Sequence, residues 1–177
     1  MKAPPQISLS AHICVIFAAM AETPPVSKVL TALGFPHRVF RHAGTVSSLE
    51  QAASERGQAP RQVVRSLVFR IGDETYVMVL VAGPAQVSWP TLRMYLGQSR
   101  LTMATEEEVL AATGYRVGTV APLGLATPMR ILADENVFQP SEISFGSGER
   151  NVGIIMRSAD LRRALGEVET GRFIATT

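Results

Sequence analysis

The chain has 177 residues, of which 46% are hydrophobic and 18% are charged, with a net charge of +2 and an isoelectric point near 9.0. This length suits one domain with a core of its own, and the balance of residues excludes a disordered tail and a highly charged nucleic-acid coat. The small positive charge is compatible with contact to a polyanion over a limited area.

The apolar residues 1–19 stand apart from a domain that we place at residues 20–177. The stretch "ISLSAHICVIFAAM" is too short to span a bilayer. It fits either the hydrophobic part of a signal peptide or an over-extended translation start, with Met20 as the true first residue. Because the rest of the sequence has the character of a cytoplasmic domain, we favour the over-extended start and expect a cytoplasmic protein without a membrane segment.

Three short elements are predicted after Met20. Apolar residues recur at helical spacing from Val26 to Leu33, and Gly34 follows where a C-terminal cap belongs. Residues 37–42 then read as a strand. The stretch "SSLEQAASERG" begins with a capping-box pattern and ends at a glycine, so it predicts a second helix.

The clearest strand pair runs over Arg65–Ile71 and Thr75–Ala82, joined as a hairpin. The second strand, "TYVMVLVA", is apolar without alternation, which indicates that both of its faces are covered. A short helix is expected over residues 88–97. A further helix is predicted over residues 105–114, where a capping box and the run Glu106–Glu108 mark a helix start.

Short strands are predicted around Met129–Ala133, Glu142–Phe145 and Val152–Met156, and the helix "SADLRRALG" follows them. Helices and strands are mixed, and neighbouring strands are often joined by short turns. This order favours an α+β fold of one domain, built around a mixed and largely antiparallel sheet.

No common catalytic signature is present. The sequence lacks a nucleophile elbow, a phosphate-binding glycine loop and a zinc-protease helix. The single cysteine, Cys14, excludes an internal disulfide, and the three histidines, His12, His37 and His42, lack ligand spacing. We therefore expect neither a metal nor an organic cofactor.

Two glycine-rich loops are the unusual features. Residues 113–125, "TGYRVGTVAPLGL", and residues 144–151, "SFGSGERN", could let backbone approach a ligand closely. The alternative is that both are ordinary turns between elements.

The stretches "VVRSLVFR", "TGYRVGTVAPLG", "ADENVF" and "ISFGSGERN" resemble successive landmarks of the YbaK/ProX family, the editing domains associated with prolyl-tRNA synthetase. The resemblance runs from about Pro24 to Glu169, and its strongest piece is the pattern G-Y-x-x-G-x-x-x-P-x-G. It implies a twisted, barrel-like mixed sheet flanked by helices. It also implies a deacylase that acts in trans on the acceptor end of mischarged tRNA, most often tRNA-Pro carrying alanine or cysteine, with prolyl-tRNA synthetase as a further partner.

The family is not known for a protein nucleophile, so the resemblance implies that water, the ribose hydroxyl or the substrate attacks the ester. The loop Gly118–Pro122 would hold the aminoacyl group, and Gly118 would help to orient the scissile carbonyl. The residues expected to bind substrate are Gly118, Thr119, Val120, Ala121, Pro122, Gly146, Ser147 and Gly148.

Arg65 interrupts an apolar run, so its charge must reach solvent, find a partner or serve a site. The resemblance places it where the family has a lysine that contacts the terminal nucleotide and supports catalysis. Arginine keeps the positive charge but is bulkier than an ammonium. We expect Arg65 to be catalytic and to contact tRNA, and the same departure leaves open a domain that binds without hydrolysis.

The remaining candidates each have an ordinary alternative. Arg150 and Asn151 could contact the tRNA, or be solvated loop residues. Ser147 could bond its own backbone instead of substrate. The resemblance also matches an acidic pair at Asp134 and Glu135, which an acidic turn or a helix cap explains equally well. Tyr115 and Trp89 could stack on a base, or pack in the core or at its edge.

Overall fold

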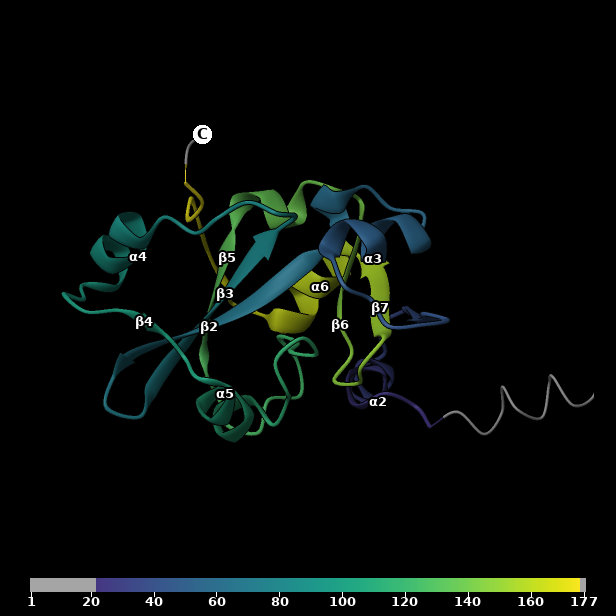
Figure 1. Cartoon of the computed structure of the whole chain (residues 1–177), viewed down its shortest axis with the longest axis horizontal. Coiled ribbons are helices and arrows are strands. Elements are labelled where there is room, and N and C mark those ends of the chain that lie inside the picture. Colours follow the sequence, from purple (N-terminus) through teal and green to yellow (C-terminus); the bar gives the residue numbers. More distant parts are fainter. Residues whose placement is uncertain (1–21, 176–177) are drawn as a thin grey trace, which may run out of the picture.

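The computed structural model describes residues 22–175 (Figure 1). The apolar stretch over residues 1–19, with its two alternatives for the start of the protein, lies outside the described residues. None of the helices in residues 22–175 combines the length and the apolar character that crossing a membrane requires.

The predicted helices are all present, and local signals explain their ends. Thr105 and Glu108 form the expected capping box, with the Glu108 N–H donating to Thr105 Oγ1 (3.3 Å) and the Thr105 N–H donating to Glu108 Oε2 (2.8 Å). Gly97 and Gly114 cap two helices in the left-handed region, where glycine carries no Cβ penalty. The α-helices of the described part are α2 (Pro25–Ala32), α3 (Leu49–Glu55), α4 (Trp89–Leu96), α5 (Glu106–Thr113) and α6 (Ser158–Leu165).

The strands form a five-stranded sheet in the order β4-β2-β3-β5-β8 and a three-stranded sheet in the order β1-β7-β6. Pairing is antiparallel except for β3 with β5 and β5 with β8. The first sheet contains β4 (Thr102–Met103), β2 (Val64–Gly72), β3 (Thr75–Ala82), β5 (Arg130–Asp134) and β8 (Glu169–Gly171); the second contains β1 (Arg38–Arg41), β7 (Val152–Arg157) and β6 (Glu142–Gly146).

The mixed α+β class is confirmed, but the β-structure is divided into two sheets and does not close into a barrel. The sheets approach each other where β2 follows the 3₁₀ turn η1 (Pro60–Gln62). There a single parallel bridge joins Val63 to Ser144 in the middle of β6. Because the pairing stops after this one bridge, the adjoining edge of β2 stays open.

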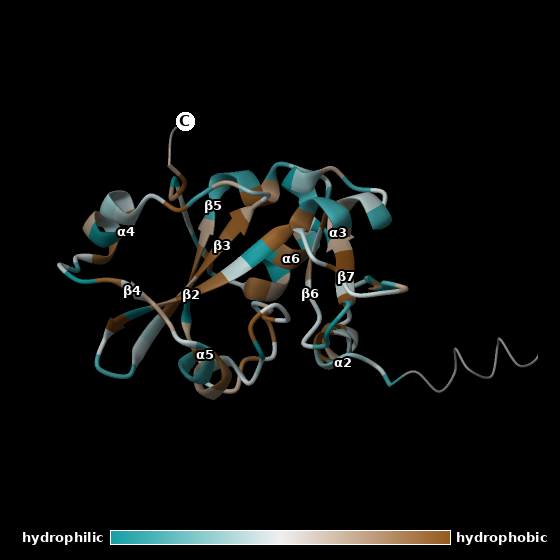
Figure 2. Ribbon diagram, viewed as in Figure 1, coloured by the Kyte–Doolittle hydropathy of each residue, from teal (hydrophilic) through white to brown (hydrophobic). Residues whose placement is uncertain are grey.

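Strand β3 is buried on both faces, as its unbroken apolar run predicts. Met78 and Leu80 face the core between the two sheets. The alternate residues Val77, Val79 and Val81 pack against α4 and the C-terminal segment. Figure 2 shows β3 as a hydrophobic strand, while the adjacent β2 carries a hydrophilic segment between hydrophobic ones. That segment brings polar side chains to the middle of the fold.

Asp134 serves the fold, which favours the ordinary alternative for this residue. Its side chain is fully buried and caps the 3₁₀ turn η2 (Glu135–Phe138) by accepting from the Asn136 N–H (3.1 Å). Its other oxygen accepts from the backbone N–H groups of Phe173 (2.8 Å) and Ile174 (3.2 Å). The carboxylate therefore ties the C-terminal segment to β5.

Replacing Asp134 with asparagine is expected to lower the free energy of unfolding by about 1–2 kcal/mol. The amide keeps one acceptor but places N–H groups opposite backbone donors, and bonds to a charged acceptor are the stronger ones. Chemical denaturation measures this loss. A variant that is as stable as the natural chain would show that these hydrogen bonds of Asp134 do not stabilise the fold.

Candidate functional site

A cavity of about 420 Å³ lies along the open edge of β2. Beyond Phe69, this edge is covered by β4, and before Val64 it meets β6 through the single bridge at Val63. The cavity fills the interval between them and brings together four of the predicted site residues: Arg65, Gly118, Val120 and Gly146. Its other lining residues are Val64, Ser66, Leu67, Val68, Met103, Ala104, Glu106, Val109 and Val117.

The first glycine-rich loop follows α5 and is held in shape by its own hydrogen bonds. The buried Tyr115 donates its hydroxyl hydrogen to the carbonyls of Leu123 (2.7 Å) and Gly124 (3.1 Å), which closes the loop. Burial raises the pKa of the Tyr115 phenol, so the donor stays protonated. Tyr115 is thus a core residue of the loop, and its predicted alternative as a platform for a base does not apply.

The second glycine-rich loop packs directly on the first. The Gly148 N–H donates to the Thr119 carbonyl (3.0 Å). A Cβ on Gly146 would lie 2.4 Å from the Val120 carbonyl oxygen and 2.7 Å from that of Thr119. Position 146 therefore requires glycine, because only a bare backbone allows the two loops to come this close.

Gly118 presents bare backbone to the cavity. It adopts a left-handed conformation (φ +86°), and a Cβ built on it would meet no atom within 4 Å. The neighbouring Thr119 turns its hydroxyl back to the Arg116 carbonyl (2.9 Å). The space next to Gly118 is thus unfilled by other residues, while the Thr119 side chain stabilises the turn.

Several predicted substrate contacts belong to the frame of the site and do not line the cavity. Three residues of the first loop are buried, namely Thr119, Ala121 and Pro122, and in the second loop Gly148 packs against Tyr115 and Pro25. The fully buried Ser147 donates its hydroxyl hydrogen within its own loop, with the Val152 (2.9 Å) and Glu149 (3.2 Å) carbonyls as acceptors. The predicted contact of the Ser147 hydroxyl with substrate is therefore replaced by the backbone alternative.

Arg65 has found a partner. It lines the cavity, and its half-buried guanidinium donates to the Ala85 carbonyl after β3, while its Nε has no partner. Burial lowers the pKa of this guanidinium from its ordinary value, but arginine stays charged in proteins. Arg65 therefore forms part of the cavity wall, while the tip of its guanidinium is held by one backbone carbonyl that does not itself line the cavity.

Ser66 is a site residue that the sequence reasoning missed. Side chains alternate along a strand, so Ser66 leaves β2 on the face of Val64 and Val68. Its hydroxyl is buried and has no hydrogen-bond partner in the described structure. A buried polar group without a partner is uncommon in folded proteins, and this one lies in the cavity wall.

Of the two predicted tRNA contacts in the second glycine-rich loop, one is exposed and the other is hydrogen-bonded within the fold. Arg150 is exposed and lines a depression next to the cavity, together with Arg116 and Val117. Asn151, at φ +59°, is engaged in the fold: its side chain accepts from the Val46 N–H (3.3 Å), and its carbonyl accepts from the His42 N–H (2.9 Å). Its predicted contact with tRNA is therefore not supported by its geometry, whereas Arg150 stays available.

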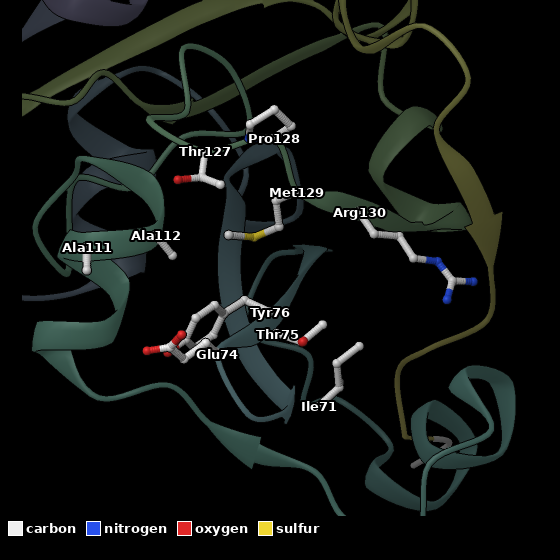
Figure 3. Close-up of a pocket in the computed structure, with 10 residues that line it drawn as sticks. All are labelled: Ile71, Glu74, Thr75, Tyr76, Ala111, Ala112, Thr127, Pro128, Met129 and Arg130. Atoms are coloured by element: carbon white, nitrogen blue, oxygen red, sulfur yellow. The ribbon is translucent and has the colours of Figure 1, made fainter.

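A larger cavity, of about 630 Å³, lies between the β2–β3 hairpin, α5 and β5 (Figure 3). It contains none of the predicted site residues. Arg130, at its border, points away from the other lining side chains in Figure 3 and binds both carboxylate oxygens of Glu169 (2.6 and 2.7 Å). The cavity beside β2 is therefore the better candidate in spite of its smaller volume.

No group of three or more His, Cys, Asp or Glu side chains in residues 22–175 could hold a metal ion. His37 is bonded to the Ser27 hydroxyl (2.7 Å), and His42 to Glu55 (2.5 Å) and Arg56 (3.2 Å). Neither histidine lines the cavity. Within residues 22–175, the Ser66 hydroxyl therefore has no histidine beside it to act as a base.

Comparison with known families gives a match to the model of the aminoacyl-tRNA editing domain over residues 43–164. Among proteins of known name, the chain is similar to the proline–tRNA ligases of Thermosipho melanesiensis (32% identity over 114 residues) and Kosmotoga olearia (36% over 92 residues). These matches cover 64% and 52% of this chain. The chain spans only 20% and 16% of the length of those ligases.

Among solved structures, one described as a candidate trans-editing enzyme for prolyl-tRNA synthetase aligns with a TM-score of 0.78 and 25% sequence identity. The alignment covers 97% of this chain and all of the other. The likeness therefore extends over the whole fold and not only over the glycine-rich loops.

Proposed function

Because the chain belongs to the aminoacyl-tRNA editing domain family, we propose that it is a deacylase that hydrolyses the ester of mischarged tRNA in trans. The substrate we propose is tRNA-Pro that carries alanine or, second, cysteine. The observation that carries the proposal is the cavity beside β2, which brings the bare backbone of Gly118 and the predicted site residues Arg65 and Gly146 together in one wall. A substrate of this kind places the activity in the cytoplasm.

The chemistry of ester hydrolysis suits this cavity. The developing oxyanion needs preorganised donors, and backbone amides can supply them without a titratable residue. Gly118 presents such backbone, and the tight contact between the two loops holds it in place. Since neither described histidine lines the cavity, the proposed nucleophile is water or a substrate hydroxyl and not an activated serine.

Selectivity for a small amino acid is supported by the apolar side chains around Gly118. Val64, Val68, Val109 and Val120 line the cavity from three different elements. A wall of branched side chains limits the size of the amino-acid side chain that fits, although one methylene on that side chain is worth only about 1–3 kcal/mol of discrimination. The ring of cognate proline would be excluded by shape at the same wall.

The proposed partner is the acceptor end of the tRNA, with few phosphate contacts. Replacing Arg150 with glutamine is expected to weaken tRNA binding by about 1 kcal/mol and to reduce the slope of log K against log salt by about 0.7, the value for one contact to a single strand. Filter binding across a salt series measures both. Arg172→Gln is the matched control because Arg172 is paired with Glu135 (2.8 Å), and an equal loss there would argue against a specific role for Arg150.

The direct test is a panel of tRNA-Pro charged with alanine, cysteine or proline and incubated with the full chain. The proposal predicts release of alanine or cysteine above the uncatalysed rate while proline stays attached. Equal release of all three amino acids, or none, would contradict it.

One observation favours a second function, a module that binds aminoacyl-tRNA or a synthetase without hydrolysis. The Arg65 guanidinium donates to the Ala85 carbonyl. Position 65 also carries an arginine where the resemblance implies a lysine. Binding of mischarged tRNA without turnover would distinguish this module from the deacylase.

A further inference from the structure

Glu106 stands at the boundary between the cavity and the depression beside it. It is the first residue of α5, and helical spacing stacks it above Val109, which lines the cavity, and Leu110, which lines the depression. Glu106 thus lies on the border that the depression shares with the cavity lined by Gly118.

The three glutamates at the start of α5 differ in what they do. Glu108 completes the cap of the helix with Thr105 and pairs with Arg70 (2.9 Å), so its charge is used in the fold. Glu106 forms no hydrogen bond or ion pair with another described residue, although it borders the cavity. All three carboxylates suit the positive end of the helix dipole, but of the three only Glu106 also lines the cavity.

A second observation in the same cavity points to a polar ligand. The Ser66 hydroxyl is buried in the wall without a partner. A buried hydrogen-bonding group without a partner costs free energy, and a ligand that supplies the missing hydrogen bond removes that cost. The cavity therefore presents two oxygen atoms, at Glu106 and Ser66, that can accept hydrogen bonds.

The group on an aminoacyl ester that matches such acceptors is its α-ammonium. It carries three N–H donors and a positive charge next to the scissile carbonyl, and bonds between charged groups are stronger than neutral ones. An N-acylated amino acid, as at the end of a peptidyl-tRNA, has neither the charge nor three donors. A carboxylate at the border of the cavity would therefore select free aminoacyl esters.

We propose that the Glu106 carboxylate, with the Ser66 hydroxyl as a second acceptor, binds the α-ammonium of the aminoacyl group, an inference that rests on the deacylase function proposed above. Glu106 then determines specificity. It separates aminoacyl-tRNA from N-blocked and peptidyl-tRNA by charge, whereas the valine wall separates small side chains from large ones by size.

The test compares Ala-tRNA-Pro with N-acetyl-Ala-tRNA-Pro as substrates of the full chain. The measured quantity is the ratio of the two kcat/KM values in each variant relative to the natural chain, because this comparison cancels the different intrinsic lability of the two esters. Glu106→Gln is expected to reduce the ratio about 10-fold by slowing only the free-amine substrate, the effect of losing one charge-assisted hydrogen bond. Ser66→Ala is expected to reduce it in the same direction, by about threefold.

Glu107→Gln is the matched control. It removes the same charge from the same helical turn, but Glu107 does not line the cavity, so the ratio should be that of the natural chain. A ratio that is unchanged in Glu106→Gln, with both substrates hydrolysed, would overturn this inference alone. Failure of the natural chain to hydrolyse either substrate would overturn the deacylase function and this inference with it.

Discussion

Replacing Gly146 with alanine is expected to reduce deacylation about 100-fold and to lower the free energy of unfolding by about 1–3 kcal/mol. The new Cβ would lie 2.4 Å from the Val120 carbonyl oxygen, so the two loops must separate by about 1 Å. Forcing an extra methyl group into a packed site costs this much stability. A displacement of about 1 Å at the reacting groups is enough for a 100-fold loss of rate.

Denaturation and single-turnover deacylation measure the two effects of Gly146→Ala separately. Gly44→Ala is the control, since Gly44 lies in an exposed loop where an added Cβ meets no atom within 4 Å. If Gly146→Ala keeps the rate of the natural chain, the contact between the two loops does not position the catalytic backbone.

Replacing Arg65 with alanine is expected to reduce deacylation by at least about 100-fold, while Arg65→Lys should stay within about 10-fold of the natural chain. Arg65 lines the cavity and its Nε has no partner in the described structure, and loss of one donor to a developing oxyanion costs rate on this scale. Lysine keeps the charge, although it cannot reproduce the planar guanidinium. Single-turnover rates of the three proteins provide the measurement.

Denaturation of the Arg65 variants separates chemistry from folding, because Arg65→Ala also loses the hydrogen bond to the Ala85 carbonyl. A folded Arg65→Ala variant with full activity would show that the arginine only anchors the segment after β3. An inactive natural chain that gains activity as Arg65→Lys would identify the binding module instead.

The elements that local sequence determines could be predicted. The cap at Thr105, the short helix within residues 88–97 and the burial of β3 on both faces each depend on residues close together in the chain, and all were confirmed. The very short β4 and β8 carry too few residues to show a period, so sequence patterns did not reveal them.

The partner of Arg65 could not be predicted in the same way. The sequence left three alternatives for its charge: solvent, a partner or a site. The Ala85 carbonyl lies 20 residues further along the chain and is brought near only by the pairing of β2 with β3. Ser147 and Asn151 show the same limit, since the bonds that occupy them depend on how the loops fold back.

The cavity itself combined predicted and unpredicted residues. Gly118 and Gly146 could be singled out because their glycine patterns are unusual. Ser66 and Glu106 carry no such pattern, and they become site residues only because the open edge of β2 faces the start of α5.

The most direct measurement is the single-turnover release of labelled alanine from Ala-tRNA-Pro by the full 177-residue chain, with Pro-tRNA-Pro measured alongside. A deacylase predicts that alanine is released well above the uncatalysed rate and that Pro-tRNA-Pro stays charged. Tight binding of mischarged tRNA with no release of alanine or cysteine would contradict the proposed hydrolysis and leave a binding domain of the same fold.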